Sequence, residues 1–183
     1  TEHYIIVKTN EPEFDYPAGD KTIETSYEPD RGIGLTNLLR RLTLAWHLGD
    51  RNLLISGQLN SSSSVLMHRS LEDRISKVAP FIKLDADPYL VVVDGELTWI
   101  QDAYTTSESF PYSQHAGRVN YIRNSVKVTI DAYDGTMKFY VTDSNDALIK
   151  TYEAIFPELF QPIEDMPVAL RSHVRYPLDL FGF

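Results

Sequence analysis

The chain has 183 residues, with 17 Lys and Arg against 26 Asp and Glu, a formal net charge of −9 and 43% hydrophobic residues. This composition is typical of a globular protein and excludes a disordered or fibrous chain. Nucleic-acid binding is disfavoured, because phosphate contacts need clustered Lys and Arg and the chain has no basic tract. The lack of cysteine excludes disulfides, a thiolate nucleophile and cysteine-ligated metal sites.

The length suits a single α+β domain over residues 1–183, with possible sub-lobes at 1–83, of mixed structure, and 84–183, rich in hairpins. No stretch reaches the ~18 apolar residues that a membrane span requires. The first residues lack the basic and apolar regions of a signal peptide and do not begin with Met. We therefore expect a fragment of a longer protein.

Residues 4–7 are apolar and rich in β-branched side chains, which predicts a buried strand. Prolines and a glycine predict a loop over residues 11–20, and alternating polarity predicts a half-exposed strand over residues 21–28. Residues 61–64 are four serines and predict an exposed loop, followed by a short strand at residues 65–68.

The clearest helix follows Thr36, a predicted N-cap, and ends at Gly49. Arg40 and Arg41 lie off the centre of its apolar stripe, which is formed at helical spacing by Leu38, Leu39, Leu42, Ala45 and Trp46. Further helices are predicted from Ser70 to about residue 79, over residues 146–156 and over residues 166–175.

Two Asp-Gly turns predict β-hairpins in the second half of the chain. The turn at Asp94-Gly95 sets Leu90 opposite Trp99 and Val92 opposite Leu97. The turn at Asp134-Gly135 sets apolar residues against each other in the same way, in the pairs Ile130 with Phe139, Val128 with Val141 and Ala132 with Met137. The predicted fold class is α+β, with a mostly antiparallel sheet built from hairpins and packed with about four helices.

Acidic residues dominate the stretch 84–117, which holds six Asp and Glu and no Lys or Arg. The spacing of Asp85 and Asp87 suits either a Ca²⁺ site or a carboxylate pair for general acid–base hydrolysis. The alternative is turn chemistry, since Pro88 follows Asp87 and Asp94 forms a hairpin turn. No metal site is predicted, because the five histidines form no spaced ligand pair.

Asp102 and Tyr104 lie late on a predicted strand, beside threonine and serine hydroxyls. These side chains would either line a polar pocket or form a structural hydrogen-bond network. Arg40 and Arg41 are candidates for an anion site, although adjacent helical positions face about 100° apart. No catalytic residue is assigned, because the chain contains neither a Gly-x-Ser-x-Gly elbow nor a complete phosphate-binding loop.

Several strings together resemble an uncharacterised bacterial family of membrane proteins, UPF0182. They lie at residues 13–17, 38–41, 81–89, 99–106, 120–127 and 131–136. The resemblance implies a fragment of a large soluble region that follows several transmembrane helices on the extracytoplasmic side of the cell membrane. It also implies the membrane-spanning region of the same chain as a partner, and it assigns no activity or cofactor.

Two functions are therefore expected in outline. The first is an extracytoplasmic binding or assembly module of a multi-pass membrane protein. The second is a hydrolase of a cell-envelope polymer that uses Asp85, Asp87, Asp102 and Tyr104. A role for Ca²⁺ is a further, smaller alternative, and no other cofactor is predicted.

Overall fold

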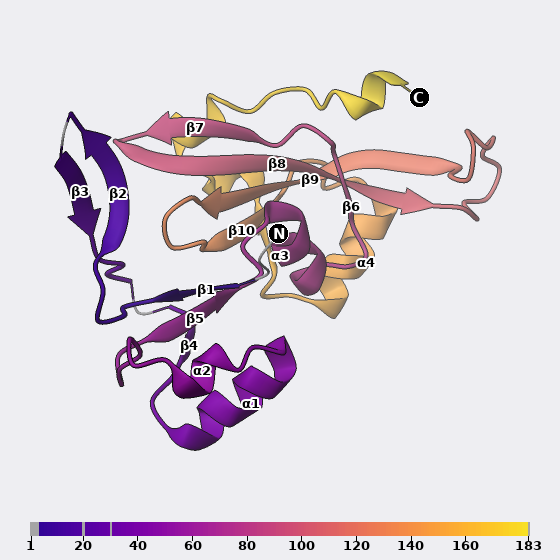
Figure 1. Ribbon diagram of the computed structural model, residues 1–183. Coiled ribbons are helices and arrows are strands. Elements are labelled where there is room, and N and C mark those ends of the chain that lie inside the picture. The colour runs from indigo at the N-terminus through magenta and orange to yellow at the C-terminus, as the bar shows by residue number, and fades with distance from the viewer. Residues whose placement is uncertain (1–3, 20, 30, 183) are drawn as a thin grey trace. The chain divides into compact units, whose positions relative to one another are not determined.

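The computed structural model describes residues 4–19, 21–29 and 31–182. The chain divides into two compact units, residues 1–70 and 71–183, which are considered separately. The predicted α+β class is confirmed: in these described ranges, five α-helices accompany sheets that are antiparallel except where β10 and β11 pair (Figure 1).

The first unit contains a small antiparallel sheet in the order β1 (Tyr4–Val7), β5 (Ser64–Met67) and β4 (Ile33–Gly34). The predicted strands at residues 4–7 and 65–68 are thus confirmed to within a residue. Leu35, Leu44, Ala45, Leu53 and Val65 form the core of this unit. Two of the serines predicted to be exposed are buried, because Ser63 donates to the carbonyl of Lys8 at 3.0 Å and Ser64 pairs within the sheet.

A two-stranded hairpin, β2 (Glu13–Ala18) with β3 (Lys21–Thr25), occupies the segment predicted as a loop. The loop prediction at residues 11–20 is wrong, and the predicted strand at 21–28 ends at Thr25. Each strand of this two-stranded sheet is an edge strand. Proline lacks a backbone N–H, and Pro17 is tolerated here because an edge strand does not need a donor on both sides. Most residues of both strands are exposed, so neither strand has the alternation of buried and exposed residues that is typical of a half-buried strand.

Helix α1 (Leu38–Leu48) is followed by the short α2 (Asn52–Ile55). The predicted N-cap Thr36 is wrong by one residue, since Asn37 has an extended backbone and its side chain accepts from the Arg40 amide at 2.9 Å. Gly49 ends the helix in the left-handed region, with φ of 69°, as predicted. Of the predicted apolar stripe only Ala45 is buried.

The second unit is built on one sheet in the order β11 (Phe160–Pro162), β10 (Met137–Val141), β9 (Tyr121–Asp131), β8 (Glu96–Ser107) and β6 (Lys83–Leu84), with β7 (Tyr89–Val93) also paired to β8. Figure 1 shows β8 and β9 as long strands side by side at its centre. Strand β8 is long enough for β7 to pair with its first half and β6 with its second half.

Helices cover this sheet on both faces, which explains why six consecutive residues in the middle of β8 and of β9 are buried. Ile75 of α3 (Leu71–Val78) and Ile149 of α4 (Ala147–Ile155) belong to one core cluster. Met166 and Leu170 belong to the other, where η1 (Ile163–Asp165) and α5 (Val168–Arg171) adjoin β7 and β10. The helix predicted over residues 166–175 is therefore shorter than expected, whereas those at 70–79 and 146–156 are confirmed.

The first hairpin has the predicted register, in which Val93 pairs with Glu96, Val92 with Leu97 and Leu90 with Trp99. Asp94 and Gly95 have φ of 53° and 85°, and positive φ at both central residues is what a type I′ turn requires.

The second hairpin differs from its predicted register by two residues, since Ile130 pairs with Met137 and Val128 with Phe139. Its loop is longer than two residues, because the Asp131 carboxylate accepts from the amides of Tyr133 and Asp134 at 2.8 and 2.7 Å. A shift of two residues keeps every side chain on its own face, so hydrophobic alternation could not distinguish the two registers.

The observed cap of α1 leads to a first prediction. Asn37→Ala removes the acceptor of the Arg40 amide and should lower the free energy of unfolding by about 1 kcal/mol, measured by urea denaturation. Thr36→Ala is the matched control and should change this free energy by less than about 0.5 kcal/mol. A larger effect at Thr36 than at Asn37 would contradict the observed cap.

Candidate functional site

Four residues predicted as candidates come together where β6 ends beside β8. Asp85 is 4% exposed and accepts a short hydrogen bond from the hydroxyl of Tyr104. The Asp85 carboxylate also accepts from the amides of Asp87 and Asp179, at 2.9 and 3.1 Å. The backbone of residues 85–87 therefore donates to the Asp85 carboxylate, and the Asp85 and Asp87 carboxylates do not act as the predicted pair.

Asp102 is bound by Lys127, the residue directly opposite it on β9. Both side chains are almost fully buried, and Asn124 donates a further hydrogen bond to Asp102 at 3.0 Å. The ammonium group of Lys127 also donates to the carbonyl oxygen of Arg175 at 2.9 Å. The pair thus connects two central strands to the C-terminal segment, residues 175–179.

The pKa values of the two aspartates, Asp85 and Asp102, are shifted in opposite directions. Burial raises the pKa of Asp102, and the nearby Lys127 only partly offsets this. Burial also acts to raise the pKa of Asp85, but hydrogen bonds from Tyr104 and from two backbone amides lower it below the usual range. Burial, together with the adjacent Asp85 carboxylate, raises the pKa of the Tyr104 hydroxyl.

Asp85, Asp87 and Asp102 line one small pocket of about 70 Å³, and residues 175–178 of the C-terminal segment line it as well. The Arg175 guanidinium lies 4.2 Å from the centre of the Tyr89 ring at this point. Pockets that bind small molecules usually have volumes of about 300–1,000 Å³. The pocket therefore has room for a few water molecules and not for a sugar ring.

A larger groove of about 460 Å³ has Asp85 in its wall, together with Glu72, Gln101 and Asp179. Asp179 accepts from the Ala86 amide at 3.0 Å, so it fastens the C-terminal segment to the chain beside Asp85. Gln101 donates to the Asp85 carbonyl at 2.7 Å. The polar side chains of this groove are thus largely engaged with the protein itself.

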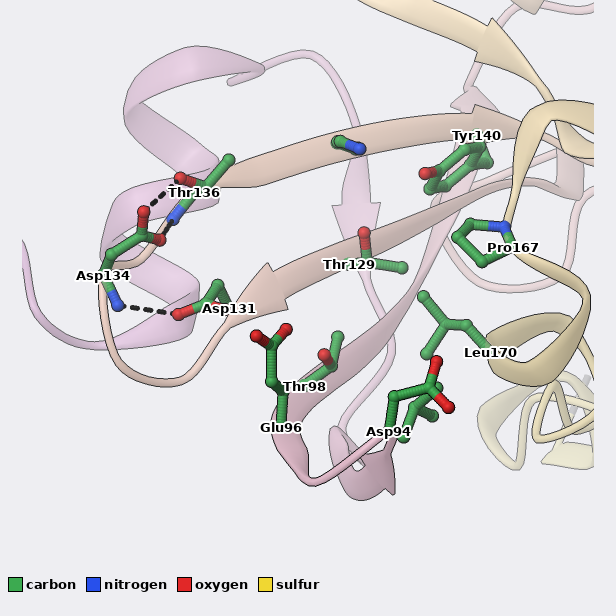
Figure 2. Close-up of a pocket in the computed structure, with 12 residues that line it drawn as sticks. Asp94, Glu96, Thr98, Thr129, Asp131, Asp134, Thr136, Tyr140, Pro167 and Leu170 are labelled. Atoms are coloured by element: carbon green, nitrogen blue, oxygen red, sulfur yellow. Dashed lines mark hydrogen bonds between the residues drawn. The ribbon is translucent and has the colours of Figure 1, made fainter.

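A third pocket, of about 360 Å³, lies at the hairpin ends, where α5 adjoins the sheet (Figure 2). Its acidic residues are Asp94, Glu96, Asp131 and Asp134. Figure 2 shows Asp134 bonded to Thr136, and Asp131 accepting from the Asp134 amide. Two of the four acids therefore hold the β9–β10 loop together.

The acidic stretch 84–117 consequently does not form one patch. Asp85, Asp87 and Asp102 line the small pocket, whereas Asp94 and Glu96 line the pocket at the hairpin ends. Within the part of the chain that the structure describes, no group of three or more His, Asp or Glu residues is arranged to hold a metal ion.

Arg40 and Arg41 lie on α1 and have different surroundings. Arg41 is half-buried and donates to the carbonyls of Leu35 and Asn60, at 3.2 and 3.3 Å, which ties the helix to two loops. The Arg40 side chain is exposed. Arg41 therefore has an evident role in the fold, and Arg40 alone presents its charge to solvent.

Asp146 is a buried carboxylate that the sequence indicated only as the start of a helix. It accepts from the hydroxyls of Thr105, Ser125 and Tyr121 at 2.5, 2.6 and 2.5 Å, and from the Leu148 amide at 3.0 Å. Burial acts to raise its pKa, but these donors lower it. Burial and the neighbouring Asp146 raise the pKa of Tyr121 to about 12.

Comparison with known proteins identifies the family. Residues 1–183 match an uncharacterised protein family, UPF0182. The chain belongs to this family. A UPF0182 protein of Cupriavidus necator is 52% identical over 180 residues, which cover 97% of this chain and 20% of the relative. Those of Pelotomaculum thermopropionicum and Clostridium acetobutylicum are 48% and 49% identical, over 99% and 100% of this chain and 20% of each relative.

The chain thus spans about a fifth of the length of these UPF0182 relatives. No solved structure matches it. Across the described residues, the helices are all too short or too polar to traverse a lipid bilayer.

The Asp102–Lys127 pair leads to a second prediction for the UPF0182 segment. Lys127→Met leaves the Asp102 carboxylate buried without its counter-charge and should lower the free energy of unfolding by about 3–5 kcal/mol. The double variant Asp102→Leu with Lys127→Met should recover most of this loss, because it removes both charges. Urea denaturation measures both changes.

The control for these two variants is Arg123→Met, which removes an ion pair near the surface, with Asp143 at 3.6 Å. It should change stability by less than about 1 kcal/mol. A double variant as unstable as Lys127→Met would show that the buried pair itself stabilises the fold.

A third prediction concerns pH. Because the pKa of Asp146 is lower in the folded state than its ordinary value of 3.8, its contribution to stability is present above pH 3.8 and is lost as pH falls below it. Asp146→Asn should cost about 1–3 kcal/mol at pH 7 and reduce the fall in stability between pH 4 and about 2. Urea unfolding at a series of pH values measures this slope.

Asp143→Asn, on the same loop, is the matched control, since this carboxylate is partly exposed. It should cost less than about 1 kcal/mol at pH 7, because the ion pair that it removes, with Arg123, lies near the surface. An Asp146→Asn variant with an unchanged slope would contradict the assignment of this acid sensitivity to Asp146.

Proposed function

We propose that this segment is a non-catalytic binding or assembly module on the extracytoplasmic side of a cell membrane, and that it contacts the membrane-spanning region of the same polypeptide. The observation that carries the proposal is how the buried charges are used. Asp102 is paired with Lys127, and Asp85 accepts from Tyr104 and two backbone amides. These groups hold strands and the C-terminal segment together.

A catalytic carboxylate needs an oxygen that reaches a substrate atom within hydrogen-bonding distance. Both Asp85 and Asp102 have protein donors at their oxygens, and the pocket that they share has a volume of about 70 Å³. A segment that serves assembly requires no such opening. The arrangement therefore favours a structural role for these carboxylates.

The comparisons support the proposal that this segment acts together with other regions of a larger protein, because the relatives are about five times as long as this chain. The family resemblance implies that those regions include transmembrane helices. The location and the partner in the proposal follow from that resemblance.

A hydrolase is the second candidate, and one observation favours it. The environments of Asp85 and Asp102 move their pKa values in opposite directions, which is how active sites distinguish a general acid from a base or nucleophile. The groove of about 460 Å³ beside Asp85 is large enough for a sugar ring. Opening of the C-terminal segment would be needed to expose Asp102.

The fourth prediction separates these functions in the full-length parent protein. A strain that lacks the parent gene is profiled for envelope defects and then complemented with the Asp85→Asn variant. If the segment serves assembly, this variant restores the envelope profile once it accumulates at the normal level. Assembly does not need the carboxylate charge, and the new amide keeps one acceptor oxygen for Tyr104 and the Asp179 amide. A variant that accumulates at the normal level in the membrane but fails to restore the profile would support the hydrolase.

The assembly role itself is tested by expressing the 183-residue chain and the rest of the parent polypeptide as two separate chains. We expect the two to co-purify from detergent-solubilised membranes. An unrelated domain of similar size and charge, carrying the same tag, is the control. Recovery no greater than that of the control would contradict the proposal.

A further inference from the structure

Helix α1 is apolar on two sides, and its own unit covers only one. At about 100° per residue, Leu44, Ala45 and Leu48 lie on one arc of the helix, and the core of the first unit covers that arc. A second arc carries Leu38, Leu39, Leu42 and Trp46, which are 67%, 71%, 46% and 91% exposed. We call these four side chains the outer face of α1.

Single exposed apolar residues are ordinary, but a contiguous apolar patch marks a surface that meets another apolar phase. The outer face of α1 is contiguous because its residues are one, three or four positions apart on a helix of 11 residues. Trp46 is its most exposed member. Tryptophan is favoured where an apolar surface meets water, because its ring is apolar and its N–H is polar.

The stretch of sequence that contains α1 has a net charge opposite to that of the chain as a whole. Residues 31–70 contain five arginines and a single acid, Asp50, whereas the remaining residues hold 12 Lys and Arg against 25 Asp and Glu. The Asp50 carboxylate accepts from the Tyr4 hydroxyl and from the Asn52 amide. Helix α1 itself has no acidic residue, and the side chains of Arg40 and Arg51 are exposed.

We infer that the outer face of α1 docks on a membrane surface that contains anionic lipid. An apolar face of leucines and tryptophan, with arginine on the polar side of the helix, is the combination by which an amphipathic helix lies in the headgroup region of a bilayer. Trp46 and the leucines enter the boundary between headgroups and acyl chains, and Arg40 and Arg51 supply attraction to lipid phosphates. The inference goes beyond the proposed function, because it concerns lipid and not another part of the polypeptide.

The local charge also argues against a second copy of the chain as the occupant. Two copies that met through α1 would bring together two helices that carry arginine and no acid, and like charges disfavour that contact. An anionic lipid surface complements the same region.

The fifth prediction is measured on the 183-residue chain with lipid vesicles. The chain contains two tryptophans, so Trp99→Phe leaves Trp46 as the only indole. We expect its emission to move to shorter wavelength on addition of phosphatidylcholine vesicles that contain phosphatidylglycerol. Flotation of these vesicles should carry the chain with them, and pure phosphatidylcholine vesicles should carry much less.

Variants then test the two components of the surface. Leu39→Ser with Trp46→Ser should abolish flotation, and both substitutions are at exposed positions, so the fold is retained in circular dichroism. Arg40→Gln and Arg51→Gln should each weaken binding to the anionic vesicles about fivefold. Val168→Ser removes an apolar side chain that is 73% exposed in the second unit, and it should leave binding unchanged.

Three results would overturn the inference. The first is flotation that persists without Leu39 and Trp46. The second is a Trp46 emission that is already at short wavelength and does not respond to vesicles, which would mean that protein covers this face. The third is a dimer seen by light scattering and lost on Trp46→Ser, in a chain that does not bind vesicles. None of these measurements involves the rest of the parent protein, so they are independent of the co-purification test.

Discussion

The ion pair between Lys127 and Asp102 is the constraint around which the second unit is arranged. Removing two charges from water costs several kcal/mol for each ion, and the cost is offset only when the pair has good geometry and further hydrogen bonds. Here Asn124 and the Arg175 carbonyl provide those bonds. If β9 slipped by two residues along β8, Lys127 would face Ile100 or Tyr104, although every side chain would stay on its own face. The polar pair therefore disfavours registers that hydrophobic alternation alone would accept.

The β9–β10 hairpin shows the limit of that alternation. Val128 and Ile130 were predicted to face apolar partners, and they do, but each partner is two residues from the expected one. The information that sets this register lies in the loop, where the Asp131 carboxylate binds two amides and makes an Asp-Gly dipeptide part of a longer turn. At Asp94-Gly95 the turn has only two residues, and there both the faces and the register were predictable from sequence.

The candidate site was predictable in its members and less so in its chemistry. Tyr104 donates a hydrogen bond to Asp85, and Asp102 is bound by Lys127 and Asn124 in place of the hydroxyls that follow it in sequence. Lys127 was missed because it alternates with Val126 and Val128 and so has the pattern of a solvent-facing residue. That pattern misleads because helices and the C-terminal segment cover both faces of the sheet. Asp146 was missed for a related reason. Its hydroxyl donors lie 21 to 41 residues away on β8 and β9, beyond any local motif.

Periodicity gave the angular positions of the apolar residues on α1 correctly but could not tell which arc is buried. Leu44, Ala45 and Leu48 face the core of the first unit because Leu53 and Val65 pack against that side. The arc with Trp46 has no such neighbour among the described residues of its own unit. Among the residues that the structure describes, buried charged groups have partners inside the fold that neutralise or bind them, as at Asp102 and Asp146. The buried charges thus have partners within the fold. The apolar outer face of α1, in contrast, is exposed to solvent. The buried carboxylates thus serve the fold, and the outer face of α1 is the surface that we infer to meet lipid.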